Sequence, residues 1–283
     1  MTETIGIAGC GTMGLPMAER LFAAGYEVWG HDVRPTAEFG AFQPRMIANP
    51  KEFAAKCDIV FSVVRDKQQT LDLCFGPAQG ILTGDVRPGV FVTCSTLSPR
   101  FVGDLAERID ARTQFADAPM SGAPFRAANG TLTFMVGGDA VLVERLVPLF
   151  ATMGEAVHHL GGVGTGMACK VVNNSVAVAE VVAVRRALKA AEALGLDRRR
   201  LLDVMTTSSG GTWYGNNFDA IDWSRQGYDP GNTIGILEKD LLAFVDALPG
   251  GAAEWEDCML DELRMMTPVA DLPRRDDPEG DPA

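Results

Sequence analysis

The stretch that decides the predicted fold is Thr4-Ile5-Gly6-Ile7-Ala8-Gly9-Cys10-Gly11-Thr12-Met13-Gly14. It begins as a short apolar run and ends with three glycines in the spacing G-x-G-x-x-G. A helical pattern follows, and a second apolar run over residues 27–31 ends at Asp32. A strand, a glycine-rich turn, a helix and a second strand in this order predict a β-α-β unit that binds a dinucleotide.

The three glycines have different expected roles. Gly9 permits the tight turn, Gly11 lets the backbone approach a pyrophosphate, and Gly14 lets the helix pack closely on the strand. The helix N-terminus then faces the phosphates, where its N–H groups favour negative charge. We therefore predict that Gly9, Gly11, Thr12, Met13 and Gly14 bind the cofactor.

Asp32, at the end of the second predicted strand, bears on which dinucleotide binds. A carboxylate at this position accepts hydrogen bonds from the adenosine ribose diol, which favours NAD and disfavours a 2′-phosphate. Arg34 lies two residues later and keeps NADP open, because an arginine nearby can hold that phosphate.

Strands and helices alternate to about residue 160. Further strands are expected at residues 59–64, 90–94, 114–118, 132–136 and 156–160, and helices at 50–56, 99–112 and 139–150. Nearly continuous apolar strands predict an α/β domain at residues 1–161, with a Rossmann-type, doubly wound and mostly parallel sheet covered on both faces. Ligands bind at the carboxyl ends of such strands, where Val64, Arg65, Thr96 and Ser121 are expected.

A second group of glycines precedes a long helical pattern, in the sequence Gly161-Gly162-Val163-Gly164-Thr165-Gly166. Lys170 and Asn174 follow it four residues apart, so they share one face of the predicted helix. Both side chains lose hydration if they are buried, which makes them unusual on an otherwise apolar helix. On spacing alone, Lys170 could equally extend along the surface and keep its ammonium group in water.

The chain after Gly161 is predicted to be helical throughout. Residues 165–194 read as one helix that is apolar on nearly every side, and further helices are expected at 201–206, 213–223, 234–248 and 255–266. We assign residues 162–267 to an all-α substrate and dimerisation domain and expect residues 268–283 to be disordered. A helix that is apolar all round needs more cover than this domain supplies, so we expect a homodimer or homotetramer formed through it.

Composition excludes several classes of function. The 283 residues carry a formal charge of −12, which argues against nucleic acid or an anionic membrane as a partner. No apolar run approaches the ~20 residues of a transmembrane helix, and no signal peptide is indicated. Six scattered cysteines fit reduced thiols in the cytoplasm. With only three histidines, no metal site is expected.

Four motifs follow one another between about residues 5 and 245. They are the glycine stretch with its continuation to Ala18, Asp117-Ala118-Pro119-Met120-Ser121-Gly122-Ala123 with Gly130-Thr131-Leu132, the stretch from Gly164 to Asn174, and Lys239-Asp240-Leu241. In these motifs and their order the chain resembles the β-hydroxyacid dehydrogenase family, which includes 3-hydroxyisobutyrate dehydrogenase and tartronate semialdehyde reductase. The set is far more specific than any single motif.

The resemblance implies an NAD(P)-dependent oxidoreductase that interconverts a short β-hydroxy acid and its semialdehyde or keto form. Lys170 is similar to the family's catalytic lysine and is expected to act as general acid and base, with Asn174 orienting the reacting oxygen. Ser121, Gly122 and Ala123 are expected to bind the substrate carboxylate, and Lys239 to lie near cofactor and substrate. Val64, Arg65 and Thr96 are expected on the cofactor.

Several residues depart from the family's pattern. The substrate loop usually reads Ser-Gly-Gly, but the third position here is Ala123, which would cost about 1 kcal/mol if that position needed a positive φ. Arg126 in the same loop could bind a second acidic group or lie at the surface. Trp213 and Tyr214 could line the substrate pocket or pack in the core. These differences affect the expected substrate and leave the reaction class unchanged.

Two alternatives remain. Imine reductases use a related scaffold, but they commonly replace the lysine, so Lys170 argues against this class. A non-catalytic dinucleotide-binding module is disfavoured because Lys170 and Asn174 are both retained. The architecture of 6-phosphogluconate dehydrogenase is shared, but this chain looks too short for its helical domain.

Overall fold

A computed structural model describes residues 3–78, 80–269 and 271–272 of the chain. The chain divides into two compact units, which are residues 1–170 and 171–283 and are called unit 1 and unit 2 below. The sequence predicts this division between residues 161 and 162, nine residues earlier. The boundary between the units lies within one long helix, α7 (Thr165–Ala193), whose first six residues belong to unit 1.

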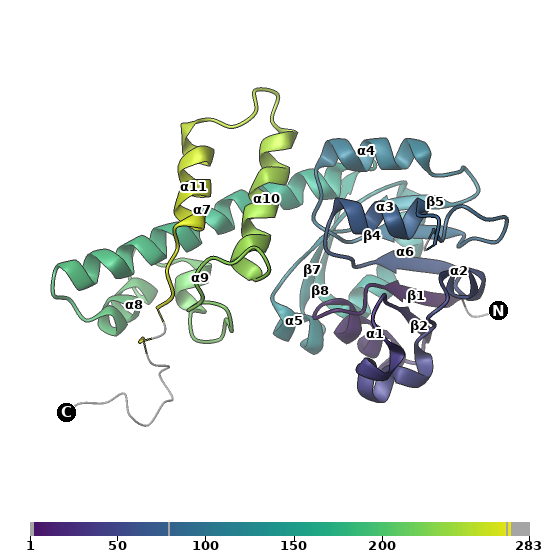
Figure 1. The fold of residues 1–283 in the computed structure, drawn as a ribbon, viewed down its shortest axis with the longest axis horizontal. Helices are drawn as coiled ribbons and strands as arrows, with labels where there is room; N and C mark the ends of the chain where they lie inside the picture. Colours follow the sequence, from purple (N-terminus) through teal and green to yellow (C-terminus); the bar gives the residue numbers. More distant parts are fainter. Residues whose placement is uncertain (1–2, 79, 270, 273–283) are drawn as a thin grey trace. The chain divides into compact units, whose positions relative to one another are not determined.

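Unit 1 is built on a single sheet (Figure 1). Its strands are β1 (Thr4–Ala8), β2 (Glu27–His31), β3 (Ile59–Ser62), β4 (Val90–Thr93), β5 (Gln114–Asp117), β6 (Met120–Ser121), β7 (Leu132–Gly137) and β8 (Gly154–Gly161). Their order is β2-β1-β3-β4-β5-β7-β6, with β8 paired to β7. Strands β1 to β5 run parallel in register with their neighbours, which confirms the Rossmann-type arrangement.

The sheet is mixed, because β7 runs antiparallel to β5 and β6. The physical reason lies in the connection after β5. For the next strand to run parallel to β5, a crossover connection must first carry the chain back to the end of the sheet where β5 begins. Here the connection is occupied by β6 and the short helix α5 (Pro124–Asn129), so the chain re-enters the sheet in the reverse direction.

Helices cover both faces of this sheet (Figure 1). One face carries α1 (Gly14–Ala23), α6 (Ala140–Met153) and the 3₁₀ segment η1 (Thr36–Arg45), and the other carries α2 (Pro50–Lys56), α3 (Lys67–Phe75) and α4 (Pro99–Arg108). A buried hydrophobic cluster lies on each face of the sheet, and successive residues of a strand contribute to the two clusters in turn. Ile5 and Ile7 pack with α1 and α6, whereas Val60 and Phe91 pack with α2 to α4. The sequence analysis missed α3, α5 and η1, which are short and weakly patterned.

Side-chain caps explain where most of these helices begin. Asn49, Asp66, Ser98 and Asp139 each accept a backbone N–H in the first turn of α2, α3, α4 and α6. Helix α1 is different, because its N-cap residue is Met13 and no side chain caps it.

Unit 2 packs short helices on the remainder of α7. They are α8 (Arg198–Thr206), α9 (Trp213–Asn216), α10 (Thr233–Ala247) and α11 (Glu254–Arg264). Val181, Val184 and Leu188 of α7 join a buried cluster with α8 and α9, while Val178 and Val182 join a second cluster with α10 and α11.

The helix predicted over residues 213–223 is wrong beyond Asn216. Trp223 stacks on Tyr214, with ring centroids 5.6 Å apart. Nine residues along one α-helix would separate them by about 13.5 Å. The chain therefore turns after α9 and brings the second ring back onto the first.

By length and composition, α7 could cross a membrane, which contradicts the expectation that no run approaches that length. The helix instead supplies side chains to both buried clusters of unit 2, and it carries the buried polar residues Asn174 and Arg185. We therefore interpret α7 as the core helix of the helical unit.

The tail predicted to be disordered begins at residue 268, but its described part is packed on unit 2. The Val269 N–H donates to the Arg225 carbonyl, and Leu272 is buried. Residues 270 and 273–283 lie outside the described residues.

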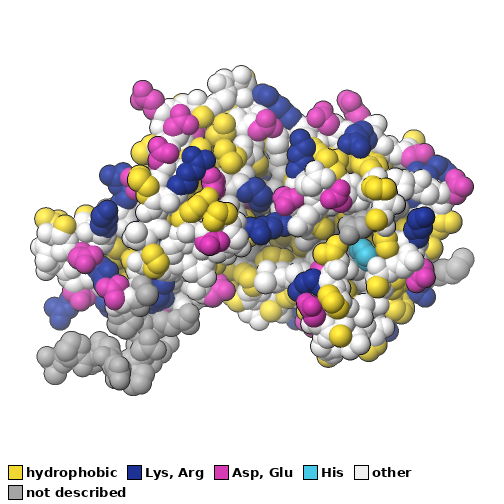
Figure 2. All heavy atoms as spheres, in the orientation of Figure 1, with side chains coloured by type: hydrophobic (Ala, Val, Ile, Leu, Met, Phe, Trp, Pro, Cys, Tyr) yellow, Lys and Arg dark blue, Asp and Glu magenta, His cyan; other side chains and the backbone are white. Residues whose placement is uncertain are grey.

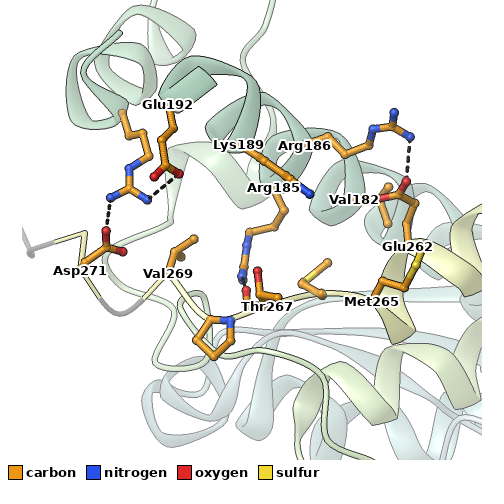
Figure 3. Close-up of a pocket in the computed structure, with 13 residues that line it drawn as sticks. Val182, Arg185, Arg186, Lys189, Glu192, Glu262, Met265, Thr267, Val269 and Asp271 are labelled. Atoms are coloured by element: carbon orange, nitrogen blue, oxygen red, sulfur yellow. Dashed lines mark hydrogen bonds and ion pairs between the residues drawn. The ribbon is translucent and has the colours of Figure 1, made fainter. Parts of the chain in front are cut away.

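Arg185 holds this C-terminal segment against α7 (Figure 3). Its guanidinium is buried and donates through Nη1 to the carbonyls of Ser224 (2.9 Å) and Gln226 (2.8 Å), and through Nη2 to the Thr267 carbonyl. Three backbone carbonyls from two distant segments thus share one cation.

Replacement of this cation should destabilise unit 2. We expect Arg185→Met to lower the free energy of unfolding by about 3 kcal/mol or more, because buried carbonyls that lose their donor cost about 1–3 kcal/mol each. Denaturant unfolding measures the change. Arg200→Met is the matched control, because Arg200 is an exposed residue of α8 in the same unit, and it should change stability by only about 0.5 kcal/mol. Equal effects of the two variants would contradict the assignment.

Candidate functional site

The glycine-rich loop after β1 has the geometry that each glycine was expected to provide. Gly9 has a φ of +91°, and a Cβ there would lie 2.7 Å from the Val63 carbonyl oxygen. A Cβ on Gly14 would lie 2.0 Å from the Gly9 carbonyl oxygen, so α1 and the loop are in direct backbone contact. A Cβ on Gly11 would meet nothing within 4 Å. Gly9 and Gly14 are therefore required by packing within the chain, whereas Gly11 borders open space.

The start of α1 is suited to an anion. It has no side-chain cap, unlike α2, α3, α4 and α6. Its first turn also contains no acidic residue. Helix N-terminal N–H groups need partners, and a phosphate can satisfy them. Thr12 and Met13 lie at this turn, and Thr12 is exposed. These residues fit the pyrophosphate of a dinucleotide.

Asp32 and Arg34 form a bidentate pair beside the loop. Arg34 Nε lies 3.0 Å from Asp32 Oδ1, and Arg34 Nη2 lies 3.2 Å from Oδ2. Nη2 also donates to the Cys10 carbonyl at 2.8 Å, and the guanidinium carbon lies 4.7 Å from the centre of the Phe39 ring. Burial opposes ionisation of Asp32, but hydrogen bonds from Arg34 outweigh it and hold the pKa of Asp32 below its usual value.

Val64, Arg65 and Thr96 lie beyond the carboxyl ends of β3 and β4, as the sequence predicts. The Val64 carbonyl accepts the Ser95 hydroxyl at 2.6 Å, and the Arg65 N–H donates to Gln69 Oε1 at 3.0 Å. The side chain of Arg65 is exposed and that of Thr96 is half-buried. The structure therefore brings this part of the predicted cofactor set to one edge of the sheet.

The predicted substrate loop follows β5. Ser121 ends β6, and Gly122 has a φ of +140°. Ala123 has φ −75° and ψ 170°, an extended conformation that any residue adopts. The positive-φ strain considered for Ala123 is therefore absent, because the demand for glycine falls on Gly122. Arg126 forms an ion pair with Glu155.

Lys170 lies in the second turn of α7 and is 7% exposed, so it does not extend along the surface. The first turn of this helix is held by Asp117, the last residue of β5. Asp117 Oδ1 accepts the Gly164 N–H and Oδ2 accepts the Met167 N–H, both at 2.6 Å. Asp117 begins the second sequence motif, but the motif by itself predicts no role for it.

The Asp117 carboxyl group is fully buried. Burial raises its pKa to about 6, against the effect of the Gly164 and Met167 amides, which lower it. At neutral pH the group is therefore ionised and accepts both amides.

In unit 2, Asn174 lies one helical turn after Lys170 along α7. It is 8% exposed, and its Nδ2 donates to Asp240 Oδ2 at 2.7 Å. Asp240 is itself buried, and its Oδ1 lies 2.6 Å from Lys239 Nζ. Sequence reasoning assigned Lys239 to the cofactor and substrate but missed Asp240 as the partner of both residues. The adjacent acid in Lys239-Asp240-Leu241 was the available signal.

Other predicted or possible site residues lie elsewhere. Tyr214 is a core residue, because it is 1% exposed and its hydroxyl donates to the Ser224 carbonyl. Trp213 is 45% exposed. A cavity of about 460 Å³ in unit 2 lies around Arg185 and Lys189, and none of the predicted catalytic or binding residues lines it (Figure 3).

Metal ligands and surface charge both bear on what the chain could bind. Within the part of the chain that the structure describes, no group of three or more His, Cys, Asp or Glu side chains is placed to hold a metal ion. Basic and acidic side chains are interspersed on the face drawn in Figure 2.

Two family models match the chain. The NAD binding domain of 6-phosphogluconate dehydrogenase matches residues 4–162, and the NAD-binding domain of NADP-dependent 3-hydroxyisobutyrate dehydrogenase matches residues 164–257.

Individual relatives agree with these models. A probable mitochondrial 3-hydroxyisobutyrate dehydrogenase of Arabidopsis thaliana is 31% identical, over 84% of this chain and 75% of its own length. The L-threonate dehydrogenase of Cupriavidus necator is 32% identical, over 87% and 84%. A solved structure of Mycobacterium tuberculosis 3-hydroxyisobutyrate dehydrogenase with L-serine is 28% identical, covers 92% of each chain and has a TM-score of 0.73.

Proposed function

This chain belongs to the β-hydroxyacid dehydrogenase family of NAD(P)-dependent enzymes, and on that premise we propose that it interconverts a short β-hydroxy acid and its semialdehyde or keto form. The observation that carries this proposal is the burial of Lys170 on a helix whose first turn is held by Asp117. An amine in such a place is shielded from bulk water and fixed in direction, as a general acid and base requires.

A nicotinamide cofactor, when bound, would supply the hydride acceptor or donor for this reaction. In this chain, Gly9, Gly11 and Gly14 with the uncapped start of α1 support binding of the dinucleotide phosphates. Val64, Arg65 and Thr96 border the same sheet edge and are proposed to contact the rest of the cofactor.

The proton is assigned to Lys170. Its amine would take the proton from the substrate hydroxyl in the oxidation direction and return it to the carbonyl oxygen in the reduction direction. Asn174 is proposed to hydrogen-bond the same oxygen, and its bond to Asp240 supports a fixed amide orientation. Ser121 and the backbone at Gly122 and Ala123 are proposed to hold the carboxylate, with Lys239 nearby.

The two alternatives are weaker. An imine reductase would not need Lys170, and the burial of this side chain together with Asn174 supports an acid–base role. A non-catalytic binding module would leave the same buried lysine without a purpose, although burying it costs free energy.

Removal of the amine tests the mechanism. Lys170→Ala should retain NAD(P)H binding but lose at least ~10²-fold in turnover, the usual scale for loss of general acid–base catalysis. The assay measures NAD(P)H formation with a panel of short β-hydroxy acids. Lys189→Ala, an exposed lysine of the same helix, is the control and should keep native turnover. Turnover in Lys170→Ala close to native would exclude the assigned role.

We propose NAD as the preferred cofactor, because Asp32 is ionised and positioned beside the glycine loop. Asp32→Ala should weaken NAD binding at least about 10-fold and NADP binding less, since the variant loses an acceptor for the ribose diol and frees Arg34 for a phosphate. Titration of cofactor fluorescence measures both affinities. Glu38→Ala removes a nearby exposed carboxylate and should change neither. A larger loss for NADP would mean that Arg34 sets the preference.

We also propose a homodimer or homotetramer formed through α7. Exposed Val or Ala side chains recur on this helix at positions 172, 176, 183, 190 and 193, and half-buried Ala179 and exposed Arg186 complete the spacing of four and three. Such a stripe, mostly Val and Ala, suits close packing against the same helix of a second copy.

We propose the cytoplasm as the compartment of the protein. All six cysteines are free thiols, which accords with this proposal.

The oligomer should depend on this stripe. Ala183→Arg places a long charged side chain at its middle and should shift the protein from at least twice its 30.2 kDa chain mass to a monomer. Sedimentation measures the mass. Val204→Arg, at an exposed apolar position on α8, should leave the native mass unchanged. A monomeric native protein would contradict the proposal.

A further inference from the structure

We propose that Asp117 is a positioning residue for Lys170, because its carboxylate sets the place of the helical turn from which the amine extends. The inference rests on the proposed function, since it assigns to Lys170 the proton transfer described above. Asp117 is buried at the end of β5 and would act on Lys170 through the backbone of α7.

The contact replaces a cap that the helix does not have in its own sequence. Gly164 precedes the helix with a φ of +90° and has no side chain, and the first turn contains no acidic residue. The two N–H groups of Gly164 and Met167 are among those that a helix leaves without internal partners. Asp117 accepts both, one on each carboxylate oxygen, from 47 and 50 residues away.

Two glycines bring the turn close enough for these bonds. A Cβ on Gly166 would lie 2.4 Å from the Met135 carbonyl oxygen of β7 and 3.0 Å from Asp117 Oδ2. A Cβ on Gly137 would lie 2.5 Å from Asp117 Oδ1 and 2.9 Å from the Gly166 nitrogen. The first turn of α7 is therefore in backbone contact with β7 around the carboxylate.

Met167 is fixed on both sides. Its N–H donates to Asp117, while its side chain is fully buried and its sulfur accepts the Leu97 N–H at 3.3 Å. Lys170 follows three residues later, one turn along the helix. A change in the axial position or rotation of Met167 would therefore be transmitted directly to Lys170.

Protonation should weaken this arrangement. The ionised carboxylate has two acceptor oxygens for two donors, whereas the protonated group presents one O–H to an N–H. Since burial raises the pKa of Asp117 to about 6, the change falls within reach of an ordinary pH profile.

The other ionisable groups near Asp117 can be named element by element. Cys94 follows β4, and its own raised pKa, caused by burial and by the charge of Asp117, keeps it a neutral thiol. Strand β7 carries no ionisable side chain, and α7 carries Cys169 and Lys170 in this region. On β8, His159 Nε2 lies 3.0 Å from the carbonyl oxygens of both Gly138 and Gly161. On α6, Glu144 is exposed and Arg145 bonds Gln114 at the opposite end of β5.

The test compares Asp117→Asn with Asp139→Asn. Asn can offer one acceptor oxygen, so one amide of α7 would face an NH₂ group. Asp139 caps α6 of the same unit, with its Oδ1 accepting the Val141 and Leu142 N–H groups at 3.0 and 3.2 Å. Asn keeps an Oδ1 that can accept both of these groups, so the control removes a carboxylate charge at a helix start of the same unit without removing an acceptor.

Turnover is measured in the reduction direction, where Lys170 is proposed to donate a proton, so a fall in kcat towards low pH cannot come from loss of that proton. We expect kcat of the native protein to fall below pH 6. Asp117→Asn should lower kcat at least 10-fold, leave KM within about threefold, and no longer show this fall. Asp139→Asn should match the native protein in all three. A kcat within twofold of native, with the acid limb retained, would overturn the inference.

A second readout does not depend on activity. Amide hydrogen exchange of residues 164–170, corrected for the intrinsic rate, should show less protection at pH 5 than at pH 7.5 in the native protein. His159→Gln, which removes the ring that contacts the Gly161 carbonyl, should show the same difference. Unchanged protection would also overturn the inference, and this holds even if Asp117→Asn does not fold. If the native protein turns over no hydroxy acid while the protection changes as expected, the proposed function fails and the Asp117 contact stands.

Discussion

The carboxylate of Asp117 accepts two N–H groups at the start of α7 and so joins the end of a central strand to the helix that leaves the sheet. Hydrogen bonds of an ionised group to backbone amides are among the strong ones in proteins. They form here inside a close approach that only glycine permits at positions 137 and 166. The first turn of α7 consequently belongs to the sheet unit, although most of the helix is the core of the helical unit.

The glycine loop after β1 shows the opposite arrangement. Helices α2, α3, α4 and α6 of the sheet unit begin with a side chain that accepts one or two of their first N–H groups, whereas α1 begins without one. Gly9 and Gly14 close the loop on itself, and Gly11 borders open space. Arg34 ties Asp32 to the Cys10 carbonyl, so the residue that bears on cofactor choice is attached to the loop that receives the phosphates.

Buried polar groups in the helical unit are oriented in the same way. Asp240 fixes the amide of Asn174, and Arg185 gathers three carbonyls from two segments. Each such group costs free energy to bury and is retained only with its partners in place. These hydrogen bonds fix the orientation of the neighbouring side chains and backbone carbonyls.

The sequence by itself determined the elements and the dinucleotide loop. Apolar periodicity and the glycine spacing depend on neighbours along the chain, so β1, α1 and β2 and the long helix α7 were predictable from local residues. The roles proposed for Lys170 and Ser121 came from motifs that are also local. Tertiary structure alone decided the reversal of β7, the early end of α9 and the extended conformation of Ala123. It also decided the pairing of Asp117 with Gly164 and Met167 and of Asn174 with Asp240, because partners separated by 47 to 66 residues leave no periodic trace in the sequence and meet only when the sheet and the helices pack.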